Sequence, residues 1–188
     1  MSGAHGHGHD HADPSNKKIA LLIAVLALVL AFSETLGKAA QTSALSYNIE
    51  ASNLWAFFQA KTIRQTTMRT AAEAVQAQFG DSAPEGLKKQ IDTWKKTAER
   101  YQSEPETGEG RKELADRAKA AEKKRDKSLA AYHHFEVASA AVQIAIVMAS
   151  ASIITSIPAL VWVAGALGAI GVAFCVIGLW FPTAVHLF

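Results

Sequence analysis

The feature that most constrains the fold of this chain is a run of 52 residues without a charged side chain, from Val137 to Phe188. In a water-soluble domain, so long a stretch would leave a large part of the surface without charged side chains to contact water. By contrast, 30 of the 36 charged residues lie between Lys38 and Phe135. This separation excludes a single soluble globule and predicts a membrane protein with a water-exposed charged region. The net charge is only +2, and we expect no nucleic-acid partner.

Three segments are long and apolar enough to be transmembrane helices. The first, 19–37, carries no charge before Glu34, and a helix from Ile19 to Leu36 rises roughly 27 Å, enough for a bilayer core. The C-terminal run divides at Pro158 into spans at 136–157 and 159–181, because proline lacks a backbone donor and favours a turn there.

A secretory signal peptide is the alternative interpretation of the first segment, because Lys17 and Lys18 precede an apolar run. No convincing cleavage site with small residues follows that run, and Glu34 lies where the site would begin. We therefore treat the segment as a span that remains in the protein.

Small residues recur at three- and four-residue spacing in all three spans. In lipid, helices associate by close packing, and small side chains allow the close approach. The pattern fits packing within one chain or between copies, and three such stripes on so small a bundle favour a homo-oligomer. The residues are Ala20, Ala24, Ala27 and Ala31 in the first span, Ala138, Ala141, Ala145, Ala149, Ser152 and Ser156 in the second, and Ala164, Gly168, Gly171, Cys175 and Gly178 in the third.

Between the first and second spans, residues 38–135 predict a long antiparallel coiled-coil stalk. From Ala40 to Phe79, residues suited to a helix interface repeat every seven positions, and only Lys61 and Gln65 break the pattern. A straight helix from Lys38 to Phe79 would rise roughly 63 Å from the membrane. The rest of the stalk must therefore bring the chain back.

Two further helices provide this return. Breakers at GDSAPEG and EPETGEG separate them, so the second helix covers Leu87 to Tyr101 and the third begins near Arg111 and continues into the second span. The alternative is that the first helix lies along the membrane surface, which its aromatic residues would suit. These are Tyr47, Trp55, Phe57 and Phe58.

The distribution of lysine and arginine near the span ends predicts the orientation. Lys17 and Lys18 lie on one side of the membrane, whereas six basic residues lie on the stalk side. The side with more basic residues is normally the cytoplasm. We therefore predict a cytoplasmic stalk. The six residues are Lys38, Lys119, Lys123, Lys124, Arg125 and Lys127.

Residues 1–18 are rich in glycine and histidine and predict a disordered tail. Imidazole groups on a flexible tail can bind a divalent transition metal, and the tail carries His5, His7, His9 and His11. The same composition gives metal affinity without any metal handling in the cell, as in a purification tag. A metal cofactor therefore stays an open possibility.

Five polar residues within or beside the spans are candidates for lining a pore, because ionisable and polar groups inside a membrane often mark function. They are Glu34, Glu136, Ser139, Gln143 and Ser150. The structural alternatives are an ion pair between Glu34 and Lys38 and ordinary hydrogen bonds between helices.

Three histidines at the same membrane face are candidates for titration near neutral pH. They are His133, His134 and His186. The alternative is that they are satisfied interfacial side chains.

The sequence carries no phosphate-binding glycine loop, nucleophile elbow, CxxC or HExxH motif. We therefore expect a non-enzymatic scaffold or partner-docking protein, with membrane lipid, further copies of the chain and a protein at the stalk as partners. The alternative is an oligomeric ion channel or metal-ion conduit.

The segments KKIALLIAVLALVLAFSETLGK and ASNLWAFFQAKTIRQTTMR resemble a family of bacterial membrane proteins, the domain-of-unknown-function family DUF4337. The stretch from Asn53 to Thr66 carries the most specific part of the resemblance, which extends over nearly the whole chain. The patterns above predict an all-α membrane protein with three transmembrane helices and a long antiparallel coiled-coil hairpin stalk. The resemblance implies a bacterial inner-membrane location and supports the layout of three spans. It assigns no activity and no site.

Overall fold

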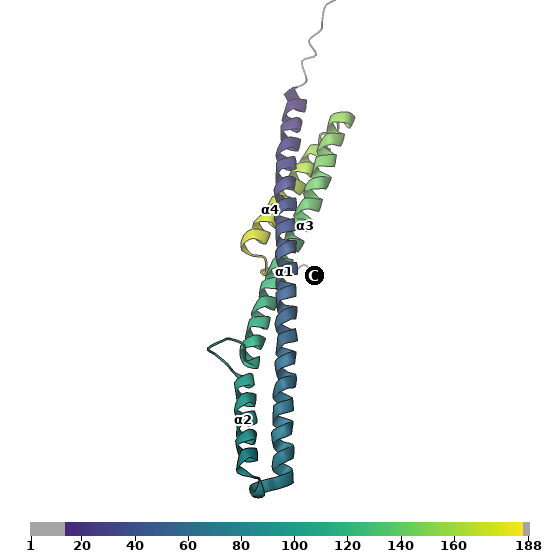
Figure 1. Cartoon of the computed structure of the whole chain (residues 1–188). Helices are drawn as coiled ribbons and strands as arrows, with labels where there is room; N and C mark the ends of the chain where they lie inside the picture. The colour runs from purple at the N-terminus through teal and green to yellow at the C-terminus, as the bar shows by residue number, and fades with distance from the viewer. Residues whose placement is uncertain (1–13, 186–188) are drawn as a thin grey trace, which may run out of the picture. The chain divides into compact units, whose positions relative to one another are not determined.

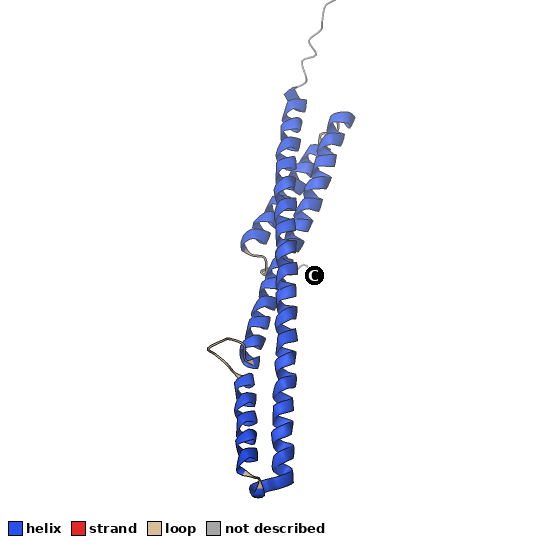
Figure 2. Cartoon of the chain, in the orientation of Figure 1, coloured by secondary structure: helices blue, strands red, loops and turns tan. Residues whose placement is uncertain are grey.

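The computed structural model describes residues 14–185, and within them the chain forms four α-helices and no strand (Figures 1 and 2). The predicted all-helical class is therefore confirmed. Three of these helices contain segments long and apolar enough to cross a membrane. The elements are α1 (Pro14–Phe79), the short 3-10 turn η1 (Gly80–Ser82), α2 (Glu85–Gln102), α3 (Arg111–Thr155) and α4 (Ala159–Trp180).

The chain divides into two compact units, and α1 and α3 contribute to both. We call residues up to Gln41 and from Ser128 onward the apolar unit, and Thr42–Lys127 the charged unit. The sequence boundary at Lys38 and Phe135, drawn from charge alone, lies within eight residues of this division.

α1 begins at Pro14, inside the segment 1–18 that the sequence predicted to be a disordered tail. Proline is favoured at the first position of a helix, where a backbone N–H would have no partner within the helix. The four tail histidines, His5, His7, His9 and His11, lie outside the described residues.

α1 packs through one seven-residue pattern that we call the inner seam. The sequence predicted this pattern from Ala40 onward, and the structure extends it back to Ile19, because each of its 17 positions up to Val75 is buried or half-buried. Phe79, the last predicted position, is exposed instead. The positions are Ile19, Ile23, Leu26, Leu30, Ser33, Gly37, Ala40, Ala44, Tyr47, Ala51, Leu54, Phe58, Lys61, Gln65, Met68, Ala72 and Val75.

In the apolar unit, the predicted small-residue stripes of α3 and α4 pack inside the chain, except for Ser156, which lies beyond the end of α3 and is exposed. The core contains Leu26 of α1, Val142 of α3 and Ala164 of α4. A methyl group added to Gly168 would lie 2.6 Å from Leu26 Cδ2, so a larger residue there would require the Leu26 side chain to shift. The α1 stripe differs, because Ala20, Ala24, Ala27 and Ala31 are all exposed. Packing within one chain therefore accounts for two of the three predicted stripes.

In the charged unit, α2 and the first part of α3 run antiparallel to α1. Lys95 of α2 donates a hydrogen bond to Gln76 (2.8 Å), and Gln65 donates to the Ala98 carbonyl (2.9 Å). Later residues of α2 therefore pair with earlier residues of α1, as in an antiparallel pair. Further along, Trp55 Nε1 donates to Glu122 of α3 (2.9 Å). A small core of alanine and leucine lies beneath these contacts: Ala51, Leu54, Leu114, Ala118 and Ala121.

The connection between α3 and α4 lies at the predicted proline. α3 ends at Thr155, two residues before the predicted end of the span, because Ser156 adopts a left-handed backbone conformation with φ of 56°. α4 then starts directly after Pro158.

Because α4 lies close to α3 at one glycine and not at another, we predict that substitution by alanine affects stability differently at the two positions. A methyl group at Gly171 would lie 2.5 Å from Val142 Cγ2 and 3.2 Å from the Ala138 carbonyl, whereas one at Gly165 would meet nothing within 4 Å. We expect Gly171→Ala to lower the thermal stability of the detergent-solubilised protein through overpacking, typically by about 1–3 kcal/mol. Gly165→Ala is the matched control and should leave the melting temperature unchanged or raised. Equal melting temperatures for the two variants would contradict this packing.

Candidate functional site

A polar groove in the apolar unit holds most of the candidate residues of the predicted spans. It has a volume of about 530 Å³ and is walled by α1 and α3. The polar lining residues are Ser33, Glu34, Lys38 and Gln41 from α1 and Tyr132, Glu136, Ser139 and Gln143 from α3. Four of the five pore-lining candidates therefore lie in one groove.

The two walls of the groove are joined by polar contacts. Ser33 and Ser139 hydroxyls lie 2.7 Å apart, and Gln143 Nε2 donates to Glu34 Oε1 at 3.3 Å. Within residues 16–185 no ion pair joins Glu34 to Lys38, so the predicted structural pairing of these two residues is replaced by the contact with Gln143. The Gln143 contact is the hydrogen bond between helices that the structural alternative expected.

Ser150 does not join this group. Its hydroxyl donates to the Ile146 carbonyl of its own helix at 2.8 Å, and it is not among the lining residues of the groove. Serine in a helix often bonds the carbonyl four residues earlier, and this local bond satisfies the hydroxyl without a neighbouring helix.

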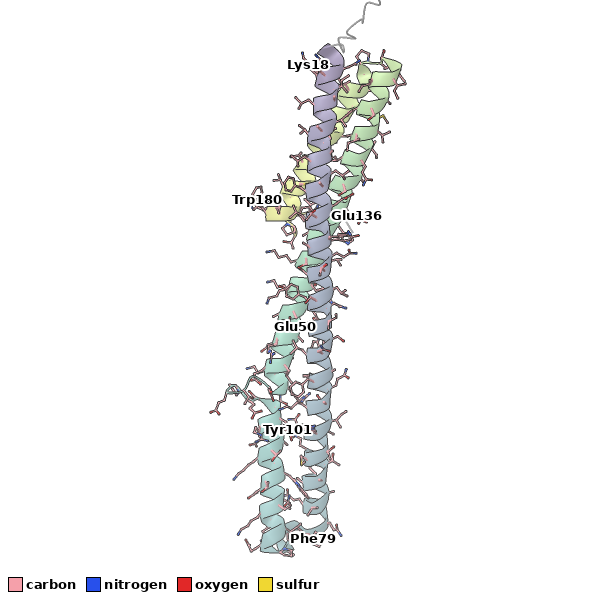
Figure 3. All side chains as sticks on the ribbon, turned by 45° about the horizontal axis from the view of Figure 1, so that its top comes forward. Lys18, Glu50, Phe79, Tyr101, Glu136 and Trp180 are labelled. Carbon is pink, nitrogen blue, oxygen red and sulfur yellow. The ribbon has the colours of Figure 1, made fainter. Side chains whose placement is uncertain are left out.

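Glu136 of the groove lining, labelled in Figure 3, has two polar contacts on its own helix. Tyr132 donates to Glu136 Oε1 at 3.3 Å, and the negative charge of that carboxylate raises the pKa of Tyr132. His133 Nδ1 lies 3.6 Å from Glu136 Oε2. The groove therefore offers two exposed carboxylates, two amides and a phenol beside the Lys38 ammonium, and its carboxylates can bind a cation or a hydrogen-bond donor.

The three candidate histidines do not form one cluster. His133 faces Glu136, whereas buried His134 points elsewhere: its Nε2 donates to the Pro182 carbonyl at 3.1 Å and its ring stacks on Phe174. Adjacent residues of a helix are rotated by about 100°, which separates their side chains. His186 lies outside the described residues.

A second polar cluster lies in the charged unit, at the two positions where the heptad pattern breaks. Lys61 and Gln65 are buried, with 6% and 2% of their surface exposed. Lys61 Nζ lies 3.5 Å from Glu104 and 3.9 Å from Glu109. It also lies 5.1 Å from the centre of the ring of Tyr101, a residue of α2 that is labelled in Figure 3. Paired charges of this kind satisfy a lysine that would otherwise be costly to bury.

Arg111, the first residue of α3, completes this cluster. Its Nη1 donates to Gln65 Oε1 and to Gln102 (3.0 Å), its Nε donates to Thr62 (2.9 Å), and its guanidinium lies over the Phe58 ring. We call Lys61, Gln65 and Arg111, with these partners, the polar layer. It joins α1, α2 and α3 at one level.

The loop between α2 and α3 is shaped so that its carboxylates reach Lys61. Glu113 accepts hydrogen bonds from the Ser103 hydroxyl (2.6 Å) and from the Glu104 backbone N–H (3.1 Å), and these bonds lower the pKa of Glu113. Gly110 is required at the base of the loop, because a side chain there would meet Glu104 N and lie 2.7 Å from Ser103 Cα.

In the sequence alone, Lys61 and Gln65 are visible only as interruptions of the heptad pattern. That interruption is the signal in the sequence for a buried polar cluster, because a polar residue on an otherwise apolar seam must either be exposed to water or have hydrogen-bonding or charged partners. The partners come from residues 33 or more positions away, which the one-dimensional pattern does not identify.

The polar layer predicts that alanine substitution of two neighbouring basic residues changes the free energy of unfolding by very different amounts. Arg111→Ala should lower the free energy of unfolding by about 1–3 kcal/mol, because Gln65 and Thr62 would lose their partner in a buried site. Lys112→Ala, at an exposed position, should change it by less than about 0.5 kcal/mol. Chemical denaturation followed by circular dichroism measures both, and similar values would show that the layer contributes nothing.

Comparisons with known proteins give one match. A family model described as a domain of unknown function, DUF4337, matches residues 15–181. No curated protein and no solved structure matches the chain. Among the described residues, no group of three or more histidine, cysteine, aspartate and glutamate side chains is arranged to hold a metal ion.

Proposed function

The chain belongs to the family DUF4337, a domain of unknown function, and from the geometry of its own residues we propose that it is a non-enzymatic, homo-oligomeric membrane scaffold. In this proposal the three apolar segments span the bacterial inner membrane. The charged unit is a cytoplasmic coiled-coil hairpin to which a protein partner docks.

The observation that carries the proposal is the difference in surface chemistry between the two units. The apolar unit exposes large apolar side chains, such as Leu21 (66%), Ile154 (85%) and Trp162 (81%). This is costly in water and favourable in lipid. In the charged unit, by contrast, 12 of the 17 residues from 111 to 127 are charged, as a water-exposed helix requires.

The polar layer supports a docking role for the charged unit. Buried polar contacts stabilise a helical assembly less than apolar packing does, and their best-attested use is to fix the alignment of helices. Lys61, Gln65 and Arg111 therefore favour one alignment of α1, α2 and α3 over shifted ones. A hairpin of defined shape is what a docking element needs.

The exposed alanines of α1 support the homo-oligomer. Within α3 and α4, the residues of the predicted stripes are buried or half-buried in the chain, whereas Ala20, Ala24, Ala27 and Ala31 of α1 are exposed. In lipid, a stripe of small residues allows a second helix to pack closely.

The mass of the protein in mild detergent, with the detergent subtracted, tests this proposal. We expect more than one chain per particle, and we expect the double variant Ala24→Leu, Ala31→Leu to shift the particle toward a single chain. Ala166→Leu, at an exposed alanine of α4, is the control and should leave the mass unchanged. A single chain in the unmodified protein would overturn the homo-oligomer.

An oligomeric ion channel or metal-ion conduit is the second candidate, and the polar groove is the observation that favours it. Glu34, Glu136, Ser139 and Gln143 would line a conducting path if several grooves faced a shared axis.

The channel predicts that Gln143→Leu abolishes conductance in planar bilayers, because the substitution removes the amide that contacts Glu34 and adds an apolar group to the groove. Ser150→Ala is the matched control, since Ser150 bonds its own helix and lies outside the groove lining. Unchanged current through the Gln143 variant would exclude this candidate.

A further inference from the structure

α1 carries a second seven-residue pattern, and in the charged unit all of its positions are exposed. We call this pattern the outer seam. Its large apolar members are strongly exposed, with Leu45 at 61%, Ile49 at 53% and Ile63 at 67%. The seam consists of Thr42, Leu45, Ile49, Ser52, Ala56, Gln59 and Ile63, which alternate at spacings of three and four residues.

The part of α1 that bears the outer seam is unusually poor in charge for a helix in water. Residues 39–63 contain only two charged side chains, Glu50 and Lys61, and Lys61 is buried in the polar layer. Residues 111–127 of α3 in the same unit have 12 charges in 17 positions. The exposed surface of α1 is therefore that of a helix with a missing partner.

We propose that the outer seam packs against the outer seam of a second copy of this chain, in parallel and in register. This deepens the homo-oligomer of the proposed function and rests on it for the direction of the helices. Copies inserted in one membrane have α1 pointing the same way, so a parallel pair is the arrangement available to them.

The spacing of the outer seam matches the proposed partner. Apolar positions that alternate every three and four residues produce a left-handed coiled coil when the facing helix has the same repeat over a similar length. A second copy meets this condition along all three heptads from Thr42 to Ile63. The same spacing continues toward the N-terminus through Lys38, Thr35, Ala31, Leu28 and Ala24 to Leu21, and each of these residues is exposed.

The chemistry of the seam is compatible with its own copy. No position from Thr42 to Ile63 is charged, so no pair of like charges meets within these three heptads when two identical helices align, and Lys38 is the first charged position on the continuation toward the N-terminus. Ser52 and Ala56 are small and allow close approach between the larger residues on either side. Gln59 would face its counterpart, and a single polar pair in a coiled-coil seam selects one register.

The outer seam is less suited to binding a membrane surface. Helices that lie in a membrane interface carry lysine or arginine beside the apolar face, which anchors them to anionic lipid. Residues 39–63 contain one basic side chain, Lys61, and it is buried against Glu104 and Glu109.

Cysteine cross-linking of the full-length protein in its native membrane tests the proposal. In a Cys175→Ser background, Ile49→Cys and Ile63→Cys each place one cysteine on the outer seam. A disulfide forms only when the two Cα atoms approach within about 7 Å, so it reports alignment and not mere proximity. Glu50→Cys and Arg64→Cys are the matched controls, because they are exposed neighbours rotated about 100° around the same helix.

Under mild oxidation we expect the two seam variants to convert mostly to a disulfide-linked dimer and the two controls to stay monomeric. Equal cross-linking of seam and control positions would indicate random collision and overturn the proposal. Cysteines at Ile49 and Ile63 that stay monomeric would also overturn it. If these cysteines were also shielded from a water-soluble maleimide, another protein or the membrane would cover the seam.

The mass of the variant with both Ile49→Lys and Ile63→Lys gives a second measurement that does not depend on oxidation. We expect loss of the oligomer, since two buried ammonium groups per chain would face their counterparts. An oligomer that persists in this variant would overturn the proposal.

Failure of this inference and failure of the proposed function are distinguishable. An oligomer that shows no seam cross-link would contradict the outer seam alone and leave the scaffold intact. A protein recovered from the soluble fraction with the seam cross-link present would contradict membrane insertion, while the pairing of the outer seams would stand.

Discussion

Both units depend on the packing of α1 through its inner seam. One seven-residue pattern extends over 17 buried or half-buried positions, from Ile19 to Val75, although the chemistry of the helix changes along it. In the apolar unit the seam holds Leu26 against α3 and α4, and in the charged unit it holds Leu54 against α3. If the apolar unit is inserted in the membrane as proposed, two different forces hold the same seam together. Close packing in lipid acts in the apolar unit, and burial of apolar surface from water acts in the charged unit.

Polar residues on the inner seam are the points where the fold acquires specific contacts. Ser33 reaches Ser139 of α3, and Lys61 and Gln65 reach α2, α3 and the loop between them. Each of these side chains obtains its partner from another part of the chain, so each constrains how the helices align. The loop that supplies Glu104 and Glu109 is in turn shaped by Gly110.

Much of the fold follows from patterns within the sequence, whereas the partners of the polar residues do not. The helices, the turn at Pro158 and the seam from Ala40 are local features of hydropathy and spacing. The sequence could not show that Ser150 bonds its own helix, that His133 and His134 diverge, or that the alanine stripe of α1 stays exposed while most of the α3 and α4 stripes is buried. Those outcomes depend on which face of each helix meets a neighbour, and that choice is made by packing between segments distant in the chain.

The most direct test of the account is the water accessibility of single cysteines in the Cys175→Ser background, measured with a membrane-impermeant maleimide on intact and on permeabilised cells. Cysteines replacing Leu21 and Leu28 are expected to stay unreactive in both, because they lie within the proposed membrane span, where water does not reach them. A cysteine replacing Lys89, exposed on α2, should react only after permeabilisation, because the charged unit lies in the cytoplasm. Free reaction at the positions of Leu21 and Leu28 would contradict membrane insertion, and reaction at the position of Lys89 in intact cells would contradict the orientation.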